Sequence, residues 1–223
     1  MTKFSNIPYF TKLGLLLAFF GASFVLIPFQ LFAPYPLTNS VVIVRELSLF
    51  LITGLLLLIV IKGEKLDLQS IGLHNRNWGK SILWSFLLLL MFFALVAGCL
   101  GLFQLTGISF GQGDHKYENI SLWVMTLMML RASIMEEVLY RGFIMERLGK
   151  MSDSWIIYLL IPSIIFGLLH YNQGIGGMII ATVSGMLFSA FYWKKRDLKI
   201  NVMAHFMVDF IPNVLIPILV GSA

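Results

Sequence analysis

Charged residues and cysteines are scarce in this 223-residue chain. Asp, Glu, Lys and Arg together make up 12% of the residues, too few for the polar surface of an ordinary soluble domain or for a disordered chain. Cys99 is the single cysteine, so an intramolecular disulfide is excluded. The sequence offers no base to activate this thiol, and we interpret Cys99 as a packing residue.

Hydrophobic residues are abundant instead, at 58% of the chain, and the mean hydropathy is +0.87. These values indicate a polytopic membrane protein. A helix that crosses the bilayer needs about 20 mostly apolar residues. The predicted fold is an all-α bundle of about seven transmembrane helices, with eight as the other count. The expected spans are 11–33, 41–61, 80–104, 119–141, 154–170, 174–193 and 200–220.

We expect residues 1–223 to form a single integral membrane domain, because the connections 62–79 and 105–118 are too short to fold alone. The first span is interpreted as a retained helix, since no small-residue cleavage pattern follows it. Residues 1–118 are predicted to be scaffold. Residues 119–220 carry most of the ionisable side chains of the spans and are predicted to form the catalytic core.

Basic residues predict the orientation, because cytoplasmic loops of membrane proteins are rich in Lys and Arg. With Lys116 as the exception, they fall on alternate connections, which places the N-terminus in the cytoplasm and the C-terminus outside. The net charge of +5 then reflects membrane orientation, and no nucleic-acid partner is expected. The basic residues on these alternate connections are Lys3, Lys12, Lys62, Lys65, Arg76, Lys80, Arg141, Arg147, Lys150, Lys194, Lys195, Arg196 and Lys199.

The segment EEVLYR, residues 136–141, places three ionisable side chains in an apolar span, where charge is costly and usually functional. Glu137 and Arg141 are four residues apart, so on a helix they form an ion pair. Glu136 is offset by about 100° and is not neutralised by that pair, so it is a candidate general base. The alternative is that all three mark a helix end, where Arg141 extends to the lipid headgroups.

Two histidine segments favour the functional interpretation. FGLLH ends the fifth span with His170, and HFMVD places His205 and Asp209 on one face of the last span. Glutamate, histidine and aspartate are the side chains that transfer protons or bind metal. We therefore expect the three helices to converge on one site. Glycines 174, 176, 177 and 185, with Ser184, favour close helix packing over a phosphate-binding loop.

In these three motifs the chain resembles the CPBP family of intramembrane proteases, also called the Abi or type II CAAX prenyl endopeptidase family. The resemblance covers roughly residues 119–220 and includes Phe166 of the second motif. It implies peptide-bond hydrolysis at or within the membrane. By resemblance, Glu136 is the general base that activates a water, His170 helps to hold that water, and His205 stabilises the oxyanion.

The remaining motif positions are assigned in the same way. Glu137 and Arg141 would order the site, with Phe166 as a supporting residue. Asp209 stands where the family often has Asn, and a carboxylate can donate to an oxyanion only when protonated, so Asp209 is expected either to share the oxyanion role or to orient His205.

No cofactor is required by this interpretation, and no metal is firmly predicted. The alternative is a zinc site with Glu136, His170 and His205 as ligands and an open position. The sequence favours the metal-free form, because it lacks the two histidines one helical turn apart that H-E-x-x-H zinc sites use.

The predicted spans place Glu136 and His205 in the cytoplasmic half of the bilayer and His170 beyond the midplane, about 10–20 Å away. A fifth helix that starts deep, after an interfacial segment at 142–153, or a tilt around Pro162 would bring His170 inward.

The expected partners are the lipid bilayer and a membrane-associated peptide or protein substrate, in a bacterial cell membrane. The resemblance there implies maturation of a bacteriocin or signalling peptide, or self-immunity. The rival hypothesis is a scaffold or immunity protein that binds a partner without hydrolysis. A transporter is disfavoured, because the two halves show no internal repeat.

Overall fold

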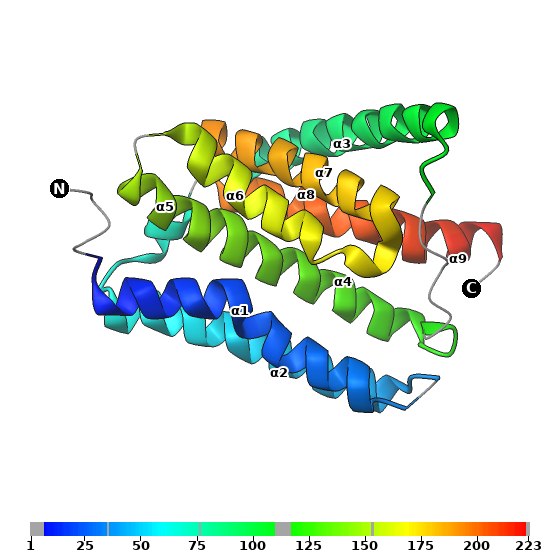
Figure 1. Ribbon diagram of the computed structural model, residues 1–223, viewed down its shortest axis with the longest axis horizontal. Helices are drawn as coiled ribbons and strands as arrows, with labels where there is room; N and C mark the ends of the chain where they lie inside the picture. The colour runs from blue at the N-terminus through cyan, green and yellow to red at the C-terminus, as the bar shows by residue number, and fades with distance from the viewer. Residues whose placement is uncertain (1–6, 35, 76, 110–116, 153, 222–223) are drawn as a thin grey trace.

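The computed structural model describes residues 7–34, 36–75, 77–109, 117–152 and 154–221. These residues form helices and their connections, with no strand among them. The helices run up and down along one long axis, and the two termini lie at opposite ends of the bundle (Figure 1). The all-α membrane bundle predicted from the sequence is confirmed.

The described residues form seven helical segments that run along this long axis. Short π-helical stretches continue three of them, and a 3-10 turn precedes α7. In chain order the bounds are α1 Tyr9–Phe32, α2 Asn39–Leu58 with η2 Ile59–Gly63, the short turn η3 Leu68–Ile71, α3 Trp78–Thr106, α4 Leu122–Glu136 with η5 Glu137–Met145 and α5 Glu146–Met151, α6 Trp155–Leu168, η6 Tyr171–Gln173, α7 Gly174–Lys195, and α8 Leu198–Phe210 with η7 Ile211–Leu215 and α9 Ile216–Val220.

Five of the seven segments are long and apolar enough to span a membrane: 9–32, 39–63, 78–106, 171–195 and 198–220. The other two segments do not meet both criteria. The helix of α4, η5 and α5 is long but carries the charged residues of the candidate site. Helix α6 is apolar but has only 14 residues.

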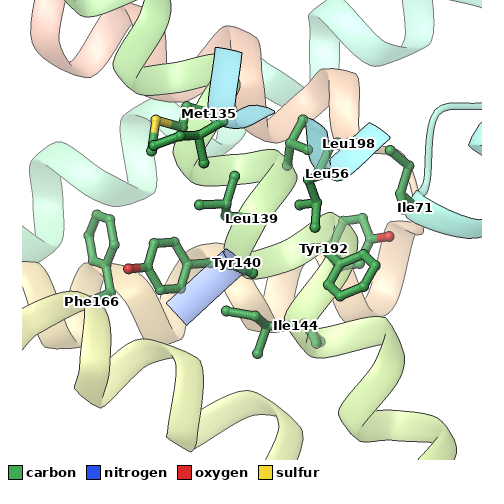
Figure 2. Close-up of a cluster of buried hydrophobic side chains, with 14 of the residues drawn as sticks. Leu56, Ile71, Met135, Leu139, Tyr140, Ile144, Phe166, Tyr192 and Leu198 are labelled. Carbon is green, nitrogen blue, oxygen red and sulfur yellow. The ribbon is translucent and has the colours of Figure 1, made fainter. Parts of the chain in front are cut away.

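The α4–α5 helix lies in the interior of the bundle, and all nine residues of η5 are buried. Side chains of α4 and η5 pack in one cluster with residues of α2, η3, α6, α7 and α8, as Figure 2 shows. The labelled members are Leu56, Ile71, Met135, Leu139, Tyr140, Ile144, Phe166, Tyr192 and Leu198. A charged segment is thus enclosed by apolar side chains from every neighbouring helix.

The predicted fourth span, 119–141, does not coincide with a whole helix, and most of the segment 142–153, offered as an interfacial connection that could bring His170 inward, is helical. The helix continues to Met151. Its last turns form ion pairs between the buried Arg147 and Glu64 and between Glu146 and Arg196. These partners come from other helix ends, so the sequence around residue 141 gave no sign of them.

The longer helix also corrects the predicted depth of Glu136. The helix continues for fifteen residues after Glu136, nine in η5 and six in α5. This part of the helix is about 22 Å long. His170 lies fifteen residues after Trp155, the start of α6, which leaves from the same end of the bundle. The two side chains therefore reach the same depth, and both line one cavity.

Helices α6 and α7 approach each other closely at small residues. A Cβ on Gly185 would lie 3.2 Å from Ser163 Cα, and one on Gly167 would lie 1.8 Å from Thr182 Oγ1. A Cβ on Gly176 would meet Ser109 O at 3.0 Å. The close helix packing predicted for Gly185 is confirmed, whereas Gly176 lies against the connection that follows α3. Gly167, inside the second motif, is a further contact of this kind.

Candidate active site

Glu137 is the buried centre of the site. Its side chain is fully enclosed, and Oε1 accepts hydrogen bonds from Arg141 Nη1 at 2.7 Å and from His205 Nδ1 at 2.9 Å. Arg141 also donates to Gly185 O at 3.2 Å, and its guanidinium lies over the rings of Phe166 and Phe188. The ion pair predicted between Glu137 and Arg141 is therefore present, and it joins η5 to α6, α7 and α8.

Asn201 is a site residue that the sequence analysis did not identify. Its Nδ2 donates to Glu137 Oε2 at 3.2 Å and to Phe188 O at 3.0 Å, and the residue is fully buried. The signal was available in the spacing, because Asn201, His205 and Asp209 follow one another at intervals of four on α8 and so share a face.

Glu136 lies beside this buried group with its carboxylate open to a cavity. Its side chain is 23% exposed, and Oε2 lies 3.8 Å from His205 Nε2. Oε1 lies 3.8 Å from Arg131 Nη1. Neither distance is a hydrogen bond, so this carboxylate keeps its acceptor positions available for a water or a substrate.

His170 sits at the end of α6, with Nδ1 2.7 Å from Phe166 O. A carbonyl oxygen only accepts, so Nδ1 carries a proton, and in the neutral ring Nε2 is left as an acceptor. The Phe166 ring packs against His170 with its centroid 4.6 Å away and lies 6.3 Å from the His205 ring. Phe166 thus spaces the two histidines.

Asp209 completes the group from the next turn of α8. Its Oδ2 lies 3.6 Å from His205 Nε2, and its side chain is 33% exposed. The His205 ring therefore has Glu137 at Nδ1 and two further carboxylates, Glu136 and Asp209, near Nε2. The structure brings the four predicted catalytic residues together with their predicted supports.

Two cavities meet at the site, and His170 lines both. The smaller, about 140 Å³, lies among α3, α7 and α8 and reaches Glu137, His205 and Asp209. The larger, about 590 Å³, lies among α1, α2, α4 and the end of α6 and reaches Glu136. Most of its lining is apolar. The polar lining residues outside the site are Ser23, Gln30, Arg45, Tyr117, Arg131, Tyr171 and Asn172.

Two buried polar atoms next to the smaller cavity, Ser184 Oγ and Arg141 Nε, have no hydrogen-bond partner among the described protein atoms. Buried polar groups of this kind are normally satisfied by ordered water. The smaller cavity is large enough for several waters, so it is a suitable store of water beside the reacting groups.

A metal site requires at least three suitable ligands. In the part of the chain that the structure describes, no group of three or more His, Cys, Asp or Glu side chains has a metal-binding arrangement. His170 and His205 each direct Nδ1 to a protein oxygen, Phe166 O and Glu137 Oε1 respectively, which leaves Nε2 of both rings toward the cavities. The metal-free form therefore stays a prediction, and so does the zinc alternative with Glu136, His170 and His205.

The comparisons with known proteins single out the same half of the chain. Residues 118–211 match the family model described as type II CAAX prenyl endopeptidase Rce1-like. This range contains all three motifs and Asn201, whereas α1, α2 and α3 lie outside it. No curated protein and no solved structure matches the chain.

Proposed function

We propose that this chain, which belongs to the CPBP family of type II CAAX prenyl endopeptidase-like membrane proteases, hydrolyses a peptide bond of a membrane-associated peptide or protein with a water activated by Glu136. The observation that carries the proposal is the placement of the Glu136 carboxylate, open to a cavity and 3.8 Å from His205 Nε2, next to a second, fully buried carboxylate that holds the same histidine.

Glu136 is the general base. A water held by Glu136 and by His170 Nε2 gives one proton to the carboxylate as its oxygen adds to the substrate carbonyl carbon. His170 is suited to hold the water because its Nδ1 is committed to Phe166 O. When the tetrahedral intermediate collapses, the C–N bond breaks and Glu136 returns the proton to the leaving amine. Atoms and charges balance without a further reactant.

His205 stabilises the oxyanion in this proposal. With both ring nitrogens protonated, it donates from Nε2 to the negative oxygen of the intermediate, while Glu137 fixes the ring through Nδ1. An ionised Asp209 cannot donate, and its Oδ2 lies 3.6 Å from Nε2. We therefore assign Asp209 to orienting His205, and the oxyanion role to His205 alone.

The larger cavity is the proposed substrate site. It is mostly apolar, it has room for several side chains, and Glu136 and His170 line it. A peptide segment drawn from the bilayer suits such a lining. A bacterial peptide that is matured at the membrane is the proposed substrate class.

The orientation is proposed from the basic end of the bundle. Lys62, Lys65, Lys150, Lys194 and Arg196 belong to the same end, where α2 and α7 finish and α5 ends. Trp155 and Trp193 stack there, and Lys195 lies over Trp84, as expected at a headgroup layer. By the positive-inside rule this end faces the cytoplasm.

The test is hydrolysis by the full-length protein in liposomes that contain a library of membrane peptides, carried out in ¹⁸O-labelled water. Mass spectrometry should find new C-terminal carboxylates that carry the label. The activity should survive a chelator, since no step uses a metal. Activity lost with the chelator and restored by zinc would replace the metal-free mechanism, and no cleavage by a folded protein would favour the scaffold hypothesis.

A further inference from the structure

Three charged residues outside the three motifs form a buried group at the larger cavity. Glu46 of α2 is fully buried, and its two oxygens accept from two arginines: Oε1 from Arg45 Nε at 2.6 Å and Oε2 from Arg131 Nε at 2.5 Å. The mechanism above does not use these side chains. Arg45 and Glu46 are buried and the Arg131 side chain is only 12% exposed, and charges enclosed in this way inside a membrane protein are costly and usually functional.

The geometry of this group directs one arginine at the proposed base. Because Nε of Arg131 is bound to Glu46, the terminal nitrogens of its planar guanidinium extend beyond Glu46, and Nη1 lies 3.8 Å from Glu136 Oε1. Arg45 is directed elsewhere, since its Nη1 donates to Tyr117 Oη at 2.7 Å. Arg131 is thus the link between α2 and Glu136.

We propose that Arg131, anchored by the buried carboxylate of Glu46, is a positioning residue that aims Glu136 into the larger cavity. The inference rests on the proposed function of Glu136 as a base. It assigns to α2, which lies outside the family-matching range 118–211, a direct influence on the reaction.

Glu136 experiences few other charges, which makes this influence measurable. Arg131 and Tyr140 face it from its own helix, and His205 and Asp209 face it from α8. His170 lines the same cavity. Arg131 is the arginine of this set, with a side chain only 12% exposed. The guanidinium of Arg131, 3.8 Å from Glu136 Oε1, is therefore the charge whose removal should change the field at this carboxylate most directly.

Neutral substitutions of Arg131 and of Glu46 should shift the pH profile of the reaction in opposite directions. In Arg131→Gln the carboxylate of Glu136 loses its cation, so the acid limb of the pH profile of kcat/KM should move to higher pH by about one unit. In Glu46→Gln an anion behind Arg131 is removed, so the same limb should move to lower pH. A merely structural role would lower the rate and the melting temperature in both variants without opposite shifts.

Two further variants serve as controls. Arg45→Gln takes one guanidinium from Glu46 but leaves Arg131 in place, so it should destabilise the same network with little movement of the acid limb. Arg131→Lys keeps the charge but offers a single nitrogen, which cannot reach both Glu46 and Glu136. It should retain the position of the acid limb and lose about tenfold in kcat.

An infrared titration makes the test independent of activity. In full-length protein with ¹³C-labelled glutamate, the Glu136 carboxylate band is obtained by subtraction of the Glu136→Gln spectrum. Its midpoint should shift up in Arg131→Gln and down in Glu46→Gln. Equal midpoints, or shifts in one direction, overturn the inference. If the midpoints shift as expected but wild-type protein cleaves no peptide, the inferred influence of Arg131 stands and the proposed function fails.

Discussion

His205 Nδ1 lies 2.9 Å from Glu137 Oε1, and this bond joins the last helix of the bundle to the buried middle of the α4–α5 helix. Because a carboxylate only accepts, Nδ1 is the donor and the ring is held with Nε2 facing Glu136 and Asp209. Two neighbouring glutamates thus have different environments, and Glu137 orients the histidine that Glu136 is proposed to work with.

Glu137→Gln should mainly lower the stability of the protein, because Glu137 has a structural role and is not the proposed base. The substitution leaves Arg141 buried, at 2% exposure, without its counter-charge, which typically costs about 3–5 kcal/mol. The melting temperature in detergent should fall by several degrees. Replacement of the exposed Asp67 by Asn is the control, and an unchanged melting temperature in Glu137→Gln would contradict the structural role assigned to this carboxylate.

Asn201→Ala should weaken the hold on Glu137, since Oε2 loses its donor and Phe188 O loses one too. The expected loss of stability is about 1–3 kcal/mol, with a lower kcat. Asn201→Asp should be less stable than Asn201→Ala, because it places a second negative charge beside Glu137. Chemical denaturation of the three proteins gives the order, and an Asp variant as stable as wild type would refute it.

Gly167→Val should displace His170 by forcing α6 away from α7. A Cβ at this position would lie 1.8 Å from Thr182 Oγ1 and 2.9 Å from Met178 O, so even the backbone must move. Hydrolysis should fall at least tenfold. Gly98→Ala on α3 is the matched control, because a Cβ there meets no atom within 4 Å. Full activity of the valine variant would show that this helix contact does not set the position of His170.

His170→Ala should lower kcat by about 10²-fold, within the usual range for a group that assists proton transfer, with little change in stability. The ring is half-buried, and its Nδ1 donates to Phe166 O in the preceding turn. Turnover measured with a saturating peptide reports the loss. If KM rises while kcat is unchanged, His170 binds substrate and does not hold the water.

The sequence predicted the helical bundle well, because apolar runs of membrane length are a local property. The pairing of Glu137 with Arg141 was also predictable, since it depends only on a spacing of four within one helix. The three motifs indicated which side chains to examine. They could not supply distances, which depend on how α6 and α8 pack against η5.

What the sequence did not predict depends on partners from distant segments. The end of the fourth helix was placed at 141, because the ion pairs of Arg147 with Glu64 and of Glu146 with Arg196 join residues 50 or more positions apart. Glu46 was interpreted as part of a scaffold for the same reason, since its contact with Arg131 spans 85 positions. Asn201 was missed although its spacing from His205 was informative.

The most direct test of the account is the rate of peptide cleavage by Glu136→Gln in liposomes, measured beside wild type and His205→Ala. Glu136 makes no hydrogen bond in the described structure that the amide would break, so this variant should keep the melting temperature of wild type. The account predicts a loss of at least about 10³-fold for Glu136→Gln and a large loss for His205→Ala. Cleavage by a folded Glu136→Gln protein at the wild-type rate would contradict it.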